Sequence, residues 1–146
     1  MKPRNPLSIF FVAVLVGVLS LLYGCHKENL CDTPFGEATC TIDITSPSFY
    51  SLYPVGGFVN IIGGNKGVFV VHTSLNEFAA FERTCPHDHD VALDTVAGSG
   101  GTLLRCPVCG SQFSTYADGA PIEGSVTSCS LYQYSTLLEG YSLYIW

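Results

Sequence analysis

Basic side chains are scarce in this sequence. Lys and Arg together number 6 among 146 residues, against 12 Asp and Glu, so the formal net charge is −6. Nucleic acids and anionic lipid surfaces are bound by clustered Lys and Arg, and we therefore expect neither as a partner. The chain also lacks a Gly-x-Ser-x-Gly elbow, a paired-carboxylate motif and a phosphate-binding loop. These absences argue against a hydrolase.

Helical periodicity is missing as well. No segment after residue 38 keeps an apolar face over three helical turns, whereas short β-branched or aromatic runs alternate with turn residues. The run from Gly63 to Gly67 predicts a hairpin, and the pair Asp118-Gly119 predicts a tight turn. The sequence therefore predicts an all-β domain, with strands at 39–44, 57–62, 68–73, 78–83, 103–105, 112–116 and 141–146.

The N-terminus carries a targeting pattern. Lys2 and Arg4 precede an apolar run from Leu7 to Leu22, and Gly24-Cys25 follows it. A run of sixteen residues crosses the roughly 30 Å hydrocarbon core poorly, so this almost entirely apolar stretch is typical of a secretory signal. The small residue before Cys25 resembles a bacterial lipobox, which implies cleavage and lipidation at that cysteine. The alternative is an uncleaved helix that anchors the chain.

Three parts of the chain follow from this pattern. We expect a lipoprotein signal peptide at 1–24, a lipidated tether at 25–38 and one β domain at 39–146. The mature chain would keep 4 basic and 12 acidic side chains. It would be anchored to a bacterial membrane through its N-terminal lipid, facing the periplasm or the cell exterior.

Cysteine is abundant for so short a chain. Of the seven cysteines, six remain if Cys25 takes the lipid, and an even number outside the cytoplasm is compatible with three disulfides. Cys31 and Cys40 enclose eight residues, and we expect a local disulfide between them. The remaining four are Cys85, Cys106, Cys109 and Cys129.

Two short motifs concentrate metal-binding side chains. The first is Cys85-Pro86-His87, and the second is Cys106-Pro107-Val108-Cys109, which Gly-Ser-Gln-Phe follows directly. Thiolate and imidazole at such spacing are typical of a metal site, although thiols in an oxidising compartment can also form disulfides.

Together the two motifs resemble the Rieske [2Fe–2S] domain over roughly residues 55–137. That family has Cys-x-His in one loop and Cys-x-x-His in a second, followed by Gly-Ser-x-Phe. The resemblance implies an antiparallel, multi-sheet β domain with two cluster-binding loops. It also implies that Cys85 and Cys106 bind the inner iron, and that His87 and Cys109 bind the outer one.

Cys109 stands where the family carries its second histidine. An additional thiolate makes the centre more negative, so a Cys₃His cluster should have a lower potential than a Cys₂His₂ cluster. Asp90 and Val108 stand where the high-potential members carry an additional disulfide pair. The resemblance therefore implies a ferredoxin-like electron carrier and not a quinol-oxidising subunit.

Two other assignments of these residues stay open. Cys₃His is an ordinary ligand set for structural zinc. Alternatively the cluster is lost, with disulfides Cys85–Cys106 and Cys109–Cys129. His89 would become a ligand only if the site shifted register by two residues.

The expected function is one-electron transfer by a membrane-anchored Rieske-like [2Fe–2S] protein. Its partner would be an unidentified redox protein that docks near His87. With no second catalytic module apparent, a non-catalytic electron carrier is favoured over a stand-alone enzyme. The alternative is a cluster-free, disulfide-stapled lipoprotein that acts as a binding or structural module.

Overall fold

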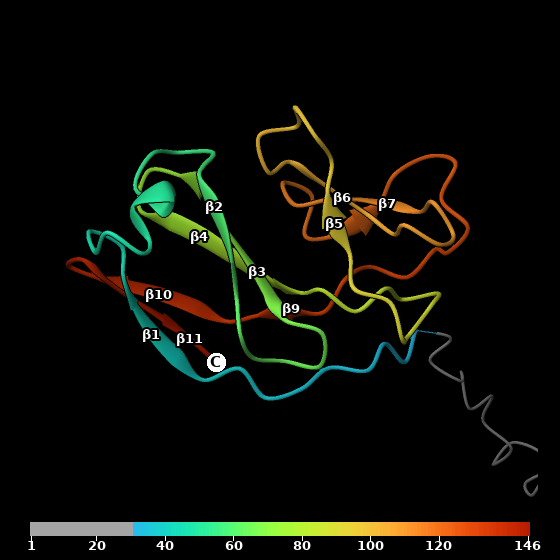
Figure 1. Cartoon of the computed structure of the whole chain (residues 1–146), viewed down its shortest axis with the longest axis horizontal. Coiled ribbons are helices and arrows are strands. Elements are labelled where there is room, and N and C mark those ends of the chain that lie inside the picture. Colours follow the sequence, from blue (N-terminus) through green and yellow to red (C-terminus); the bar gives the residue numbers. More distant parts are fainter. Residues whose placement is uncertain (1–30) are drawn as a thin grey trace, which may run out of the picture.

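The computed structural model describes residues 31–146, so the predicted signal peptide and Cys25 lie outside the described residues. Strands and one short 3₁₀ helix form this part of the chain (Figure 1). None of its helices is long and apolar enough to cross a membrane. The elements are β1 (Cys40–Asp43), η1 (Tyr50–Leu52), β2 (Phe58–Ile61), β3 (Val68–Ser74), β4 (Glu77–Glu82), β5 (Asp94–Thr95), β6 (Leu103–Arg105), β7 (Gln112–Ser114), β8 (Ala120–Pro121), β9 (Gln133–Tyr134), β10 (Thr136–Glu139) and β11 (Ser142–Ile145).

The all-β prediction is confirmed. The strands form three antiparallel sheets, with the orders β1-β11-β10, β2-β3-β4-β9 and β5-β6-β7-β8. Each of the seven predicted strands is present, within two residues at either end. The predicted hairpin joins β2 to β3, and Gly64 and Gly67 in its loop have φ of 63° and 99°. The predicted Asp118-Gly119 turn has φ of 51° and 70°.

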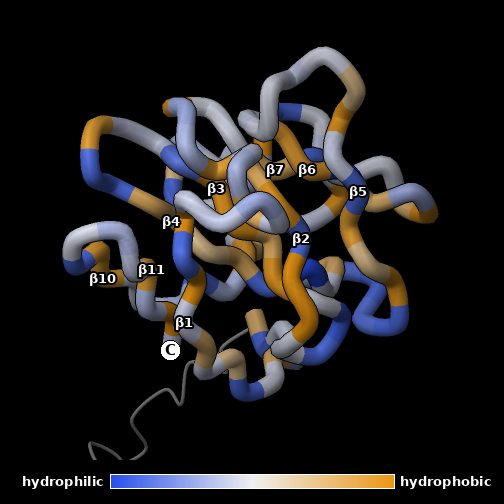
Figure 2. Tube along the Cα trace, turned by 60° about the vertical axis from the view of Figure 1, so that its left-hand side comes forward, coloured by the Kyte–Doolittle hydropathy of each residue, from blue (hydrophilic) through white to orange (hydrophobic). Residues whose placement is uncertain are grey.

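The central strand β3 is buried on both faces. Val68 and Val70 belong to a core that also contains residues of β1 and β11. Phe69 and Val71 point into a second core with Leu104 and other residues of the third sheet. In Figure 2 the hydrophobic stretch of β3 lies near the middle of the molecule. The second core also contains Cys85 and Cys106, so the candidate site rests on well-packed apolar residues.

Residues 31–38, which the sequence assigned to the tether, lie against the β domain. The ring of Phe35 stacks on Tyr132 with a centroid separation of 3.8 Å. Cys31 forms a disulfide with Cys129, and Cys40 is a free thiol. The predicted Cys31–Cys40 disulfide is therefore wrong. Its two cysteines lie at opposite ends of an extended segment, which runs along one side of the molecule to β1 (Figure 1).

A buried carboxylate ties the β2–β3 hairpin to β4 and β9. Glu82 has no exposed surface, and one of its oxygens accepts hydrogen bonds from the Asn65 amide (2.7 Å) and the Tyr134 hydroxyl (2.8 Å). The other oxygen accepts from the Lys66 amide (2.9 Å) and from the amide (3.1 Å) and hydroxyl (2.9 Å) of Thr84. Burial raises the pKa of Glu82, but these hydrogen bonds outweigh it and hold the pKa below its ordinary value.

Replacing Tyr134 with phenylalanine is expected to lower the free energy of unfolding by about 1.5–3 kcal/mol at pH 7, since a buried charge loses a donor. The same hydroxyl lies 2.8 Å from the Gly36 carbonyl, so its single proton is shared between the two acceptors. The lowered pKa favours charged Glu82 in the folded state. The stabilisation by this hydrogen-bonded carboxylate is therefore fully present above the ordinary pKa of about 4.3, and it is lost as the pH falls through the pKa of Glu82 in the folded protein. Chemical denaturation at pH 7 measures the loss. The matched control is Tyr141→Phe, at an exposed tyrosine, and equal stability of the two variants would contradict the prediction.

Candidate metal centre

The second predicted loop, residues 106–111, is a tight connection between β6 and β7. The Cys106 amide donates to the Ser111 carbonyl (2.9 Å), and the Gly110 amide donates to the Cys106 carbonyl (3.0 Å). Gly110 has a φ of 77°, a conformation that glycine adopts without strain. These bonds fix the direction in which the thiols of Cys106 and Cys109 leave the backbone.

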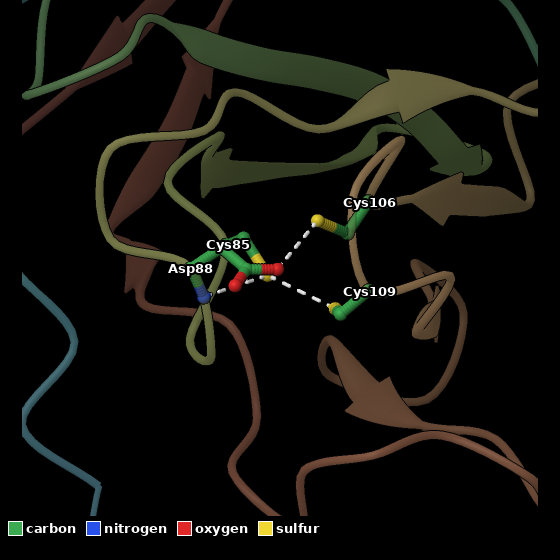
Figure 3. A group of neighbouring side chains, drawn as sticks. All are labelled: Cys85, Asp88, Cys106 and Cys109. Carbon is green, nitrogen blue, oxygen red and sulfur yellow. Dashed lines mark hydrogen bonds between the residues drawn. The ribbon is translucent and has the colours of Figure 1, made fainter.

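The first predicted loop follows β4 and leads to β5. The Cys85 amide donates to the Val91 carbonyl (2.9 Å), and the Val91 amide donates to the Asp88 carbonyl (2.9 Å). The Asp88 amide in turn donates to the Cys85 sulfur at 3.4 Å. The loop thus closes on itself and directs both Cys85 and Asp88 toward the second loop (Figure 3).

Three thiols and one carboxylate meet where the two loops face each other. One ligand atom each from Cys85, Asp88, Cys106 and Cys109 lies within 4.8 Å of all the others. The sulfurs of Cys85 and Cys109 are 3.8 Å apart, and the Cys106 thiol lies 3.3 Å from a carboxylate oxygen of Asp88. Cys85 and Cys106 are completely buried, whereas Cys109 and Asp88 are partly exposed. This donor set is soft, compact and suited to a thiophilic metal.

Burial makes two of these thiols, those of Cys85 and Cys106, poor thiolates in the absence of a metal. Desolvation raises the pKa of Cys85, and it raises the pKa of Cys106 to about 12. A bound metal cation reverses this balance, because it deprotonates a coordinating thiol outright. The arrangement therefore places sulfur ligands where only a cation makes their ionised form favourable.

The pKa of the Asp88 carboxylate, in contrast, is lowered. A hydrogen bond from the Cys109 thiol lowers its pKa most; partial desolvation opposes this, while Cys106 and His87 lower the pKa further. The carboxylate is therefore ionised at neutral pH beside three thiols.

Of the four predicted ligands, the structure brings Cys85, Cys106 and Cys109 together. His87 lies beside them, with its side chain 45% exposed and its Nδ1 atom 3.0 Å from Asp88 Oδ1. Asp88, which the motifs did not single out, joins the three thiols instead (Figure 3). Its position directly after the Cys-x-His motif is a signal that could have identified it.

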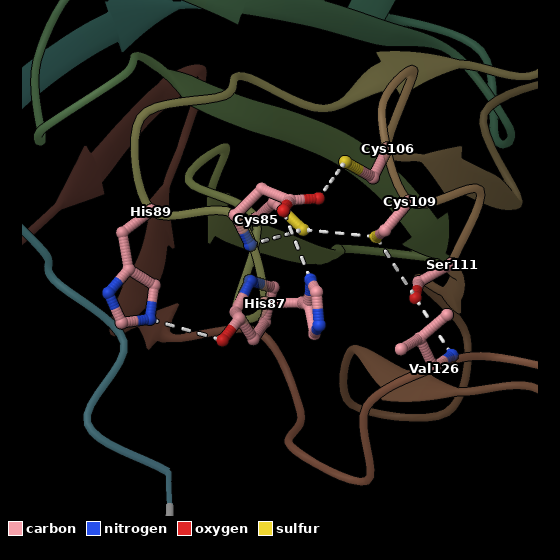
Figure 4. A network of polar contacts seen from close by, with 9 residues as sticks. Cys85, His87, His89, Cys106, Cys109, Ser111 and Val126 are labelled. Atoms are coloured by element: carbon pink, nitrogen blue, oxygen red, sulfur yellow. Dashed lines mark hydrogen bonds and ion pairs between the residues drawn. The ribbon is translucent and has the colours of Figure 1, made fainter.

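The structure also bears on two other expectations for this region, His89 as a ligand and the disulfides of the cluster-free alternative. His89 places Nε2 3.1 Å from the Pro86 carbonyl and does not join the group (Figure 4). The cluster-free alternative paired Cys109 with Cys129 and Cys85 with Cys106. Neither bond is formed, because Cys129 is bonded to Cys31 and the three site cysteines are free thiols.

A family model for the Rieske [2Fe-2S] domain matches residues 53–134, which include both loops and more than half of the chain. The protein therefore belongs to the Rieske [2Fe–2S] domain family. Membership supports electron transfer as a general role, and it implies a [2Fe–2S] cluster at the cysteine-rich site.

Among solved structures, the chain is similar to the ferredoxin of carbazole 1,9a-dioxygenase from Nocardioides aromaticivorans IC177. The identity is 17% and the TM-score is 0.48, over 75% of this chain and 95% of the ferredoxin. No curated protein sequence matches the chain.

Proposed function

We propose that this protein carries single electrons through a [2Fe–2S] cluster bound by Cys85, Cys106, Cys109 and a fourth ligand from the turn that holds His87 and Asp88. The observation that supports it is the meeting of three unpaired thiols and a carboxylate between two loops of a Rieske domain. When bound, such a cluster supplies reversible uptake and release of one electron.

The chain's own residues suit this role. The apolar side chains of Leu93, Leu104 and Phe113 are completely buried in the core that contains Cys85 and Cys106. This core excludes water from the inner side of the site, and its low polarity limits solvent effects on the potential. The chemistry of the donor set therefore fits an iron–sulfur cluster.

The outer side of the site offers a place for electron exchange. His87 is exposed, and Val108 at the tip of the second loop is 69% exposed. An electron-transfer partner that docks at these two loop tips approaches the site more closely than one that docks elsewhere on the third sheet. We propose a second redox protein as this partner, in a small and transient interface.

We further propose that the domain is tethered to a bacterial membrane by lipid on Cys25 and faces the periplasm or the cell exterior. The proposal depends on the N-terminal sequence pattern, since Cys25 lies outside the described residues. The Cys31–Cys129 disulfide is consistent with an oxidising compartment. Radiolabelled palmitate incorporated by cells expressing the full chain, and lost in Cys25→Ala, would test the anchor.

Metal analysis tests the electron-carrier proposal directly. Residues 26–146, purified without oxygen, are expected to contain about two irons and two acid-labile sulfides per chain, with a visible spectrum that dithionite bleaches. Cys109→Ser should lose or alter this spectrum, whereas Cys40→Ser, at a free cysteine outside the site, should not. Zinc in place of iron, or a metal-free protein after anaerobic reconstitution, would contradict the proposal.

A further inference from the structure

We infer that Asp88, and not His87, supplies the fourth ligand of the metal centre. This inference rests on the proposed function, because it concerns the same site. It changes the ligand set from Cys₃His, which the family pattern implies, to three thiolates and one carboxylate.

The position of the carboxylate is the first argument. Asp88 Oδ2 lies 3.3 Å from the Cys106 sulfur, and the carboxylate belongs to the group of donors within 4.8 Å of one another. No nitrogen of His87 belongs to that group. In Figure 3 the Asp88 side chain reaches across from the first loop toward the thiols of the second.

The backbone around Asp88 keeps the side chain in this direction. The Asp88 amide donates to the Cys85 sulfur (3.4 Å), and its carbonyl accepts from the Val91 amide (2.9 Å). The residue is thus fixed on both sides of its Cα atom, and its side chain is only 22% exposed. A ligand held in place before the metal arrives loses little conformational entropy on binding.

His87 has the features of a residue that orients a ligand. Its Nδ1 atom lies 3.0 Å from Asp88 Oδ1, the oxygen that does not contact Cys106, while its ring is close to half exposed. One oxygen of the carboxylate is therefore engaged from outside and the other points inward. A hydrogen bond to the outer oxygen fixes the orientation of a coordinating carboxylate, as outer-shell partners of metal ligands commonly do.

Charge supports the same assignment. Among the described residues, His87 is the only basic side chain within ion-pair distance of the Asp88 carboxylate, and no Lys or Arg lies that close to it. When a metal binds and the three thiols become thiolates, its positive charge would therefore be the main compensation for the Asp88 carboxylate.

Nitrogen coordination can be measured without an activity assay. The reduced, iron-loaded protein, labelled with ¹⁵N only in histidine, is expected to show no strong hyperfine coupling to nitrogen in pulsed electron paramagnetic resonance. His87→Ala should keep the form of the cluster spectrum, because no ligand is removed, and it should retain more iron than Asp88→Ala. Asp88→Ala should lower the iron content at least roughly tenfold, since losing a ligand costs more than losing an outer-shell partner.

Two matched variants separate ligation from folding. Asp88→Cys, which returns an anionic ligand to the same place, should retain iron, and Asp90→Ala, at an exposed carboxylate in the same loop, should behave as wild type. Strong ¹⁵N coupling that disappears in His87→Ala would overturn the inference while leaving the [2Fe–2S] proposal intact. An iron-free wild-type protein would instead overturn the proposed function and this inference with it.

Discussion

Replacing Cys109 with histidine is expected to raise the reduction potential of the iron-loaded protein by at least about 100 mV. The substitution restores the residue that the family carries at this position. Because a neutral imidazole replaces a thiolate, the cluster loses one negative charge and is more easily reduced. A redox titration followed by visible absorbance measures the change.

The size of the shift follows from the two limiting ligand sets. Clusters with four cysteine ligands in plant-type ferredoxins lie near −400 mV, whereas exchanging two thiolates for imidazoles places Rieske centres at about −150 to +300 mV. Exchanging one thiolate for an imidazole should therefore raise the reduction potential by at least about half of the smallest difference between these two classes of cluster. For a one-electron couple, about 100 mV corresponds to roughly a 50-fold change in the equilibrium for reduction.

The position of Cys109 makes the exchange feasible. Its side chain is partly exposed, and its thiol donates to the Ser111 hydroxyl at 3.2 Å. Histidine can therefore extend toward solvent without displacing the buried Cys85 and Cys106. Val108→Ala is the matched control in the same loop and should leave the potential unchanged. A Cys109→His protein with the wild-type potential and intact cluster would show that Cys109 is not a ligand.

Strands with strong local signals could be predicted from the sequence. The run Val68–Thr73 is β-branched and apolar, and the hairpin loop before it is rich in glycine, so its place in a sheet is evident from local chemistry. In contrast, β5, β8 and β9 have two residues each. Pairing with neighbouring strands defines such short elements, and no periodic pattern can be recognised in two residues.

The candidate site shows the same division between local and tertiary information. The motifs identified the three cysteines, because ligand spacing within a loop is a local property. The choice between His87 and Asp88 depends on how one loop turns toward the other, and adjacent residues in a turn point in different directions. Only the structure shows that the carboxylate faces the thiols and that the imidazole contacts it from outside.

The disulfide was mispredicted because proximity in sequence was taken as proximity in space. Cys31 and Cys129 are 98 residues apart, and their bond depends on residues 31–38 running back along the domain. Cys40 is held in β1, where it pairs with Ile145 of β11. Nothing in the spacing of the cysteines distinguishes these pairings before the sheets are assembled.

Replacing Cys31 with serine is expected to lower the free energy of unfolding by about 2–4 kcal/mol. The disulfide closes most of the domain into one loop, and removing it increases the conformational freedom of the unfolded chain. Denaturant unfolding under non-reducing conditions measures the difference. Cys129→Ser should cause the same loss, and reduction of the wild-type protein should reproduce it.

Cys40→Ser is the control that separates the two pairings. It should change stability by less than about 1 kcal/mol, since Cys40 is free and only partly buried. A Cys31–Cys40 bond would give the opposite pattern, in which Cys40→Ser matches Cys31→Ser and Cys129→Ser is close to wild type. Mass spectrometry of non-reduced proteolytic peptides identifies the bonded pair independently.

Replacing Cys31 with serine is also expected to affect the metal site, through one short series of contacts. Cys129 lies in the segment whose Val126 amide donates to the Ser111 hydroxyl (3.0 Å), and this hydroxyl accepts from the Cys109 thiol (3.2 Å). Without the disulfide, the segment from Val126 to Cys129 loses its covalent link to Cys31. We therefore expect faster iron loss from Cys31→Ser than from Cys40→Ser when both are incubated with a chelator at temperatures where they remain folded. Equal rates would show that the disulfide stabilises the fold without supporting the loop that carries Cys109.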